Sequence, residues 1–338
     1  MMNRSRRSTR KTVLVVAAAA TATALLAAGC SSTGGAKAAS GGSAVSAGKA
    51  GTAHMTFAMI THAAPGDTFW DIVRKGAEAA AAKDNVTLQY SNDQVASKQA
   101  ALVNNAVAAK VDGIALTLST PDAIIPAAKQ AEAAGIPVSA FNQGESYWQQ
   151  AGAIGYFGSD EKVAGAALAD RLNTLGAKHD LCVIQQQGSV ALEDRCAGVK
   201  SSFKGTTDTI YVNGADMSSV LSTLEAKLKQ DSSIDQVTAL GAPIALTALQ
   251  AISAAGSSAK VSTFDLNQQA AADIKSGKIE FSVDQQPYLE GYLAVDALWL
   301  YKINGDTVGG GKPTLTGPAF VDSSNISAVY QYAVNGTR

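Results

Sequence analysis

The sequence has few charged residues and little histidine, and it lacks the common catalytic motifs. Charged residues make up 16% of the 338 and hydrophobic residues 46%, which is too apolar for a disordered polymer. His54, His62 and His179 lack the four-residue spacing of a helical zinc site. No Gly-x-Ser-x-Gly nucleophile motif occurs, and the glycines at 309–311 fail as a phosphate loop because Lys312 precedes proline. We therefore expect no metal, no cofactor and no enzymatic activity.

Clustered positive charge is also missing from the part of the chain expected to fold. Without residues 1–29 the chain has 22 basic and 28 acidic residues, a net charge of −6. Nucleic-acid binding needs a clustered excess of positive charge, so it is disfavoured. The length suits two domains of about 150 residues each.

The amino terminus has the pattern of a signal peptide. Five basic residues lead into an apolar, alanine-rich run of 17 residues that ends at Leu-Ala-Ala-Gly-Cys30. This ending resembles the lipobox of bacterial lipoproteins, which implies that residues 1–29 are removed and Cys30 is lipidated. The alternative is ordinary secretion with an incidental cysteine. Residues 5–7 resemble a twin-arginine signal, but Thr9 and Arg10 stand where that signal has apolar residues.

Residues 30–52 are expected to form a flexible, lipid-anchored linker. From residue 31 to 52 only Ser, Gly, Ala, Thr, Lys and Val occur, with no apolar periodicity. Such a segment has a root-mean-square reach of about 25 Å. We expect a protein that is secreted across the cytoplasmic membrane and held on its outer face, with a folded body starting near His54.

Beyond residue 54 short apolar runs alternate with stretches of helical periodicity. The first series predicts four strands and three helices, at 55–60, 69–83, 88–91, 98–109, 113–118, 122–134 and 137–141. The second predicts strands at 181–185, 210–213, 237–240, 261–264 and 281–283, and helices at 192–203, 218–230, 244–255 and 268–276. Alternation of this kind predicts an α/β fold with two doubly wound, parallel-sheet lobes.

Ligands of open α/β sheets bind at the carboxyl ends of the strands. The polar and aromatic residues at those ends are Asp67, Phe69, Trp70, Asn142 with Gln143, Arg195, Asp265 and Gln285. Each has another explanation, since Phe69 and Trp70 could be core residues, Asp265 could cap the following helix, and Arg195 could be solvated. Their joint placement at strand ends favours a binding site.

Cys182 and Cys196 lie in a region expected to be outside the reducing cytosol, where a disulfide would persist. Cys182 is placed on a strand and Cys196 on the next helix. Elements packed about 10 Å apart bring the Cα atoms within the ~7 Å limit only if both side chains face one another. A disulfide and two buried free thiols both remain open.

Several longer stretches carry a resemblance to a known family. They are Gly66-Asp67-Thr68-Phe69-Trp70-Asp71, Gly76-Ala77-Glu78, Gly135-Ile136-Pro137-Val138, Leu192-Glu193-Asp194-Arg195-Cys196-Ala197-Gly198, Thr263-Phe264-Asp265, Gly277-Lys278-Ile279 and Val283-Asp284-Gln285-Gln286-Pro287-Tyr288-Leu289-Glu290-Gly291-Tyr292. In this order, over residues of about 54 to 322, they resemble the periplasmic binding proteins of the ribose-binding type, the sugar-recognition components of bacterial ABC importers.

The resemblance implies roles for the candidate residues. Phe69 and Trp70 match aromatics that sandwich a sugar ring, while Arg195, Asp265 and Gln285 match groups that take its hydroxyls. Two positions differ from the ribose-type pattern, which has Asp-Arg where this chain has Asn142-Gln143 and often Asn-Asp where it has Gly241-Ala242. These changes remove charge and bulk, so another pentose or hexose, a linear polyol or a cyclitol is as well supported as ribose.

The resemblance also implies an organisation and a mechanism. The N-terminal lobe is expected to comprise 53–158 and 286–318, and the C-terminal lobe 159–285 and 319–338, with crossings near Gly158, 285–287 and 317–320. The lobes would close on a monosaccharide or polyol, and the monomeric protein would then dock on ABC permease subunits. The alternatives are a sugar-sensing receptor for a membrane signalling partner and a secreted carbohydrate-active enzyme.

Overall fold

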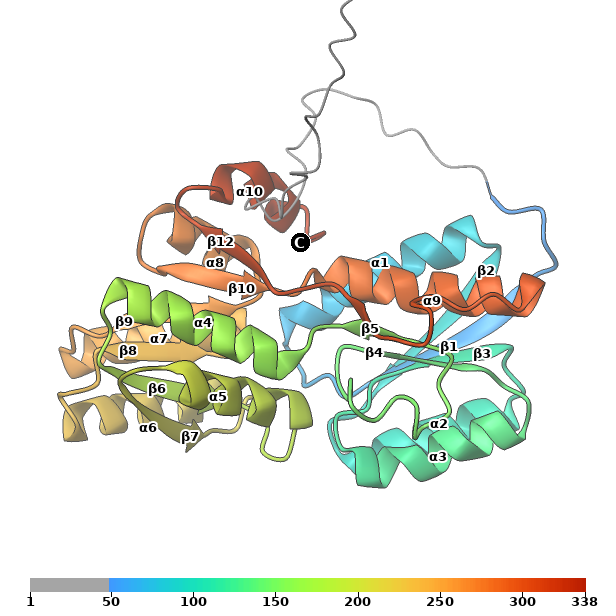
Figure 1. The fold of residues 1–338 in the computed structure, drawn as a ribbon, viewed down its shortest axis with the longest axis horizontal. Coiled ribbons are helices and arrows are strands. Elements are labelled where there is room, and N and C mark those ends of the chain that lie inside the picture. The colour runs from blue at the N-terminus through green and yellow to red at the C-terminus, as the bar shows by residue number, and fades with distance from the viewer. Residues whose placement is uncertain (1–48) are drawn as a thin grey trace, which may run out of the picture. The chain divides into compact units, whose positions relative to one another are not determined.

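The computed structural model describes residues 49–338, in which strands and helices alternate along the chain (Figure 1). Within this range, none of the helices combines the length and the apolar character needed to span a bilayer. The predicted signal peptide, Cys30 and most of the predicted linker lie outside the described residues. The chain contacts the folded body from Ala50, whose N–H donates to the carbonyl of Lys83.

The first sheet has the strand order β11-β5-β4-β3-β1-β2, with all neighbouring pairs parallel. Its strands are β1 (Met55–Thr61), β2 (Val86–Asn92), β3 (Gly113–Leu116), β4 (Val138–Phe141), β5 (Tyr156–Gly158) and β11 (Thr314–Leu315). One face is covered by α1 (Thr68–Lys83) and α9 (Pro287–Asn304), and the other by α2 (Ala96–Ala108) and α3 (Pro121–Ala133) (Figure 1).

The second sheet has the order β12-β10-β9-β8-β6-β7 and is parallel except for the pair β10 and β12. Its strands are β6 (His179–Ile184), β7 (Thr206–Tyr211), β8 (Gln236–Ala239), β9 (Lys260–Phe264), β10 (Phe281–Asp284) and β12 (Ala319–Asp322). Its helices are α4 (Glu161–Leu175) and α5 (Val190–Ser202) on one face, and α6 (Met217–Gln230), α7 (Ala242–Ala255), α8 (Gln268–Lys275) and α10 (Ile326–Val334) on the other.

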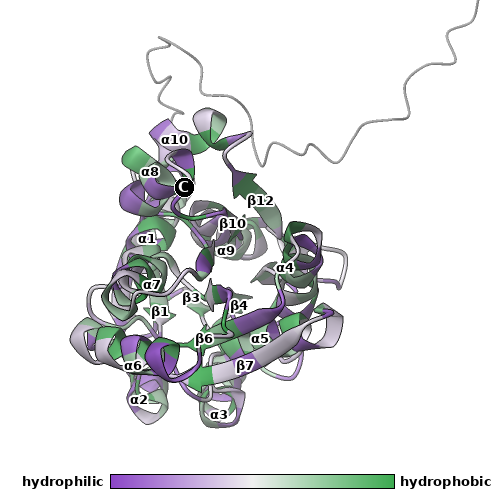
Figure 2. Ribbon diagram, turned by 90° about the vertical axis from the view of Figure 1, so that its left-hand side faces the viewer, coloured by the Kyte–Doolittle hydropathy of each residue, from purple (hydrophilic) through white to green (hydrophobic). Residues whose placement is uncertain are grey.

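Each sheet has a hydrophobic core on both faces, which explains the continuous apolar runs of its strands. In β1, Phe57 and Met59 pack beneath α1 and α9, whereas Ala58 and Ile60 pack toward α2 and α3. Successive side chains of a strand point to opposite faces, so a strand covered on both sides must be apolar at every position. The helices expose their other face to water and accordingly carry both hydrophobic and hydrophilic residues (Figure 2).

Glycines allow two helix pairs to approach closely. A Cβ atom at Gly291 of α9 would lie 2.0 Å from the carbonyl oxygen of Val73 in α1. A Cβ atom at Gly165 of α4 would lie 2.1 Å from the carbonyl oxygen of Arg195 in α5. The first contact fixes α1, which carries Phe69 and Trp70, and the second fixes the backbone of Arg195.

The predicted fold class is confirmed: the protein is α/β, with two doubly wound lobes. The chain passes between them three times, after β5, after β10 and after β11. The lobe boundaries drawn from the sequence remain a prediction. The sequence analysis omitted β5, α4, α9, β11, β12 and α10, and it did not foresee that β12 runs antiparallel to its neighbour.

Candidate functional site

A cavity of about 170 Å³ lies between the two sheets, lined by residues that follow strands of both. Residues after β1, β2 and β4 contribute from the first lobe, and residues after β6, β7, β8, β9 and β10 from the second. All eight side chains selected from the sequence line this cavity, namely Asp67, Phe69, Trp70, Asn142, Gln143, Arg195, Asp265 and Gln285. The structure therefore brings them together, as expected for residues at the carboxyl ends of parallel strands.

The beginning of α1 supplies the two aromatic residues and a carboxyl group. The rings of Phe69 and Trp70 meet edge to face, with centroids 5.0 Å apart. Trp70 is largely buried, and Phe69 is less so. Since the two rings are perpendicular, they form two walls of a corner and not a pair of parallel plates. Asp67 caps the helix by accepting from the Phe69 N–H, and burial raises its pKa to about 6.

Asp265 follows β9 in a left-handed backbone conformation with φ of 61°. Its carboxylate accepts from Nε2 of Gln285 at 2.8 Å. Burial raises its pKa to about 7, while the positive charge of Arg195 acts in the opposite direction. The cap of the following helix, α8, is Asn267, so capping does not explain the presence of Asp265.

Arg195 is not a free cation, because it forms a buried ion pair that the sequence did not predict. Its Nε and Nη2 donate to the two oxygens of Glu161, the first residue of α4, at 2.6 and 2.8 Å. The guanidinium stacks over the ring of Phe264, and Nη1 donates to the carbonyl of Leu240 at 3.4 Å. Burial alone would lower the pKa of Arg195, but the Glu161 carboxylate raises it above its ordinary value. Arg195 therefore stays protonated, and the carboxylate of Glu161 neutralises its positive charge.

Asn142 connects the cavity to a second buried acid, Glu290 of α9. Asn142 also has a left-handed backbone, with φ of 62°, which asparagine tolerates better than most residues. Its Nδ2 donates to Glu290 at 3.1 Å and to Gln285 at 3.2 Å. Thr316, on the third crossing, donates to the other oxygen of Glu290. Burial raises the pKa of Glu290 well above its ordinary value. The sequence signal that could have identified Glu290 is its position as an acidic residue in the first turn of a helix that follows a crossing between the lobes.

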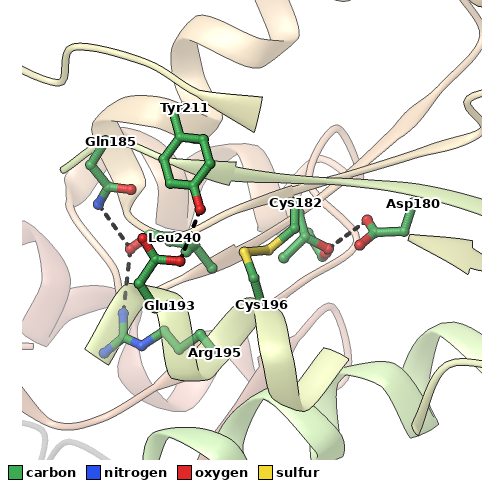
Figure 3. Close-up of a disulfide and its surroundings, with 10 residues drawn as sticks. Asp180, Cys182, Gln185, Glu193, Arg195, Cys196, Tyr211 and Leu240 are labelled. Carbon is green, nitrogen blue, oxygen red and sulfur yellow. Dashed lines mark hydrogen bonds between the residues drawn. A yellow bond between two sulfur atoms is a disulfide. The ribbon is translucent and has the colours of Figure 1, made fainter. Parts of the chain in front are cut away.

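The cavity wall is rich in amide side chains, half of which the sequence analysis did not select. These amides are Gln94, Asn142, Gln143, Gln185, Gln186 and Gln285. Gln185 donates through Nε2 to the carbonyl of Leu240, and its buried Oε1 has no hydrogen-bond partner within residues 49–338 (Figure 3). His62 also lines the wall, and burial lowers its pKa to about 3, so it is neutral. The signal for these residues is again their position just after a strand.

The structure joins Cys182 and Cys196 in a disulfide, with their Cα atoms 5.9 Å apart (Figure 3). Cys182 lies within β6 and Cys196 on α5, one residue after Arg195. The crosslink thus ties the helix that carries Arg195 to strand β6 of the second sheet.

The cluster of possible metal ligands that the described residues contain does not line the cavity. In residues 49–338, His179, Asp208 and Asp231 are close enough together to hold an ion. They lie away from the cavity, and the ammonium of Lys227 already occupies the space between the carboxylates, 2.9 Å from Asp208 and 3.6 Å from Asp231. The cavity is lined by hydrogen-bond donors and acceptors together with two aromatic rings. Such groups are suited to binding a neutral polar molecule.

Comparison with known proteins places this geometry in context. A family model described as a periplasmic binding protein domain matches residues 57–306. The ribose import binding protein of Bacillus subtilis is 30% identical over 241 residues, which are 68% of this chain and 76% of that protein. The xylose/arabinose-binding protein of Sulfolobus acidocaldarius is 27% identical over 240 residues, 65% of this chain but only 59% of that protein.

One solved structure is considerably more similar. The crystal structure of a carbohydrate transporter from Acidothermus cellulolyticus, in complex with myo-inositol, has 60% sequence identity and a TM-score of 0.84. The alignment covers 85% of this chain and all of that one. These relatives are binding and transport proteins, not enzymes.

Proposed function

Because the chain belongs to the periplasmic binding protein family, we propose that it captures a cyclitol, with myo-inositol as the first candidate, in the cavity between its lobes. Its 60% identity to a transporter crystallised with myo-inositol supports this choice. Departures from the ribose-type pattern at Asn142-Gln143 and Gly241-Ala242 agree with it, since all four residues line the cavity.

The observation that carries the proposal is the amide-rich wall. The cyclitol myo-inositol has a hydroxyl on every ring carbon, and each hydroxyl both donates and accepts. An amide side chain likewise offers a donor and an acceptor, so neighbouring hydroxyls can pair with it in both directions. The unpartnered Oε1 of Gln185 is a ready acceptor, and the carboxylate of Asp265 is a second. Phe69 and Trp70 would cover the apolar C–H face of the ring.

Electrostatics further favour a neutral ligand. Among the described residues that line the wall, the one cation is Arg195, and Glu161 neutralises it through two hydrogen bonds. A sugar acid or an inositol phosphate would bring an uncompensated charge into a buried site, which is costly. We therefore expect myo-inositol to bind and its phosphates to be rejected.

We further propose that the ligand is delivered to an ABC permease. Contacts from both lobes would favour the closed arrangement, and the monomeric closed body would dock on the permease while a separate ATPase drives transport. Cleavage before Cys30 and lipidation of that residue would hold the protein at the outer face of the membrane, on a tether formed by residues 31–52.

The ligand is tested by thermal shift with a panel at equal concentrations: myo-inositol, ribose, xylose, glucose, sorbitol and myo-inositol 1-phosphate. We expect myo-inositol to give the largest rise in melting temperature, since a ligand at a hundredfold excess over Kd adds about 2.7 kcal/mol of stability. A larger shift with a pentose or hexose would refute the cyclitol assignment, and a shift with the phosphate would refute the electrostatic argument.

Anchoring and delivery are tested in cells. We expect Cys30→Ser to move the protein from the membrane fraction to the medium, and loss of the protein to abolish uptake of radiolabelled myo-inositol. A variant that stays with the membranes would contradict lipidation at Cys30. Unchanged uptake without the protein would contradict a transport role.

A further inference from the structure

The residue that precedes α5 makes an unusual contact with the opposite lobe. Ser189 occupies the N-cap position, where a serine oxygen ordinarily accepts from the N–H groups of the first turn. Its side chain makes no such bond. Instead Ser189, which is fully buried, donates from Oγ to Oε1 of Gln143 at 2.8 Å. The next residue, Val190, donates from its N–H to the carbonyl of Ser119 at 3.2 Å. Gln143 and Ser119 both belong to the first lobe.

On the first-lobe side, the contact continues into a buried chain of hydrogen bonds. The amide nitrogen of Gln143 donates to Nε2 of His62, whose Nδ1 bonds to Oγ1 of Thr117 at 2.8 Å. Gln99 donates to the same hydroxyl and to the carbonyl of Thr117, both at 3.0 Å. Since His62 is neutral, its Nε2 is available as an acceptor. The acceptor that Ser189 contacts is therefore held in place by hydrogen bonds to buried residues of the first lobe.

We propose that Ser189 and Gln143 form an interlobe latch, in which Ser189 is a positioning residue that slows ligand release without touching the ligand. Gln143 and His62 line the cavity, whereas Ser189 lies behind that wall. The latch rests on the proposed function, because it acts on a ligand captured by lobe closure. A hydrogen bond that can form only when the lobes meet stabilises the closed form alone, and a helix cap would stabilise both forms equally.

The latch predicts a specific kinetic signature. Removing one hydrogen bond from the closed state alone should raise the dissociation rate about two- to tenfold and leave the association rate nearly unchanged. Gln143→Ala would affect release for two reasons, because Gln143 also lines the cavity. A double-mutant cycle separates these contributions, since Ser189→Ala should have little effect once Gln143 has been replaced.

The experiment uses the full-length protein in detergent and measures myo-inositol dissociation by stopped flow. The variants are Ser189→Ala, Gln143→Ala and the double variant. Ser201→Ala is the matched control, because its hydroxyl bonds within the same helix, to the carbonyl of Gly198. Additive effects of the two replacements, or an equal effect of the control, would overturn the latch.

A second measurement does not depend on the ligand. Spin labels at Asn104→Cys and Ala226→Cys, two exposed positions on α2 and α6, report the distance between lobes. We expect Ser189→Ala to shift the distance distribution of the ligand-free protein toward longer values, and identical distributions would overturn the latch. If the unmodified protein failed to bind myo-inositol, the proposed ligand would be refuted and this distance measurement would decide the latch alone.

Discussion

Replacing Asp265 with asparagine should stabilise the ligand-free protein above pH 7. Burial raises the folded-state pKa of Asp265 to about 7, from an ordinary value near 4. Between these two values the unfolded chain loses a proton that the folded protein keeps, so the folded state loses stability as the pH rises and the loss is complete above pH 7. A difference of about three pKa units corresponds to about 4 kcal/mol, the upper limit of the gain. Asparagine does not ionise, and its oxygen can still accept from Gln285.

The same replacement should weaken ligand binding and remove most of its pH dependence. Ligand hydroxyls donate more strongly to a carboxylate than to a neutral acid, so the unmodified protein should bind about tenfold more tightly at pH 8.5 than at pH 5.5. His62 does not titrate in this range, since burial lowers its pKa to about 3. Asp67 does titrate, near pH 6. The ligand affinity of the variant should therefore still change with pH, by a smaller amount and at a lower pH than in the unmodified protein.

Calorimetric titration at half-unit intervals of pH, together with urea denaturation of the ligand-free protein at pH 8, measures both effects. Asp231→Asn, a change to an acid far from the cavity, is the control and should alter neither. The reasoning would be refuted if Asp265→Asn kept the full pH dependence of affinity, or if it were less stable than the unmodified protein at pH 8.

Three further predictions concern the framework around the cavity. Glu161→Gln leaves Arg195 buried without a counterion, so urea denaturation should show a loss of about 3–5 kcal/mol, and an unchanged midpoint would contradict the ion pair. Gly291→Ala places a Cβ atom 2.0 Å from the carbonyl of Val73 and should cost about 1–3 kcal/mol by calorimetry, whereas a neutral effect would mean that α1 and α9 can separate freely. Cys196→Ser removes a crosslink that spans 14 residues and should lower the free energy of unfolding by about 3 kcal/mol. The unmodified protein should have the same lowered stability once its disulfide is reduced, and a reduced protein that keeps its full stability would contradict this role of the disulfide.

Much of the fold could be predicted from the sequence because the strands are buried on both faces. Continuous apolar runs such as that of β1 are separated by stretches with helical periodicity. This alternation of strands and helices is compatible with few folds other than doubly wound parallel sheets. The family resemblance seen in the sequence is confirmed by the match over residues 57–306. The missed strands β5 and β11 have three and two residues, too few to show a period. The missed helix α9 did carry a signal, the proline at its first position.

The positions of the cavity residues could also be predicted, but their partners could not. The strand-end rule placed Arg195 and Asn142 correctly, since it depends only on where strands stop. Their partners Glu161 and Glu290 lie 34 and 148 residues away along the chain, and no local pattern encodes such pairings. The disulfide was left open for the same reason, because a strand and its covering helix can hold two cysteines at many distances.

These pairings decide the character of the cavity more than its composition does. Asp67, Asp265, Arg195, Glu161 and Glu290 all lie in or beside one small buried space, which by composition would be strongly charged. Arg195 and Glu161 neutralise each other, burial raises the pKa of Asp265 to about 7, and the pKa of Glu290 is higher than its ordinary value. At neutral pH Asp265 is about half protonated and Asp67, with a pKa of about 6, is mostly ionised, so the space carries less charge than its composition suggests. Selection of a neutral polyol then follows from charge compensation inside the wall, and breaking that compensation at Glu161 should be the most direct way to admit a charged ligand.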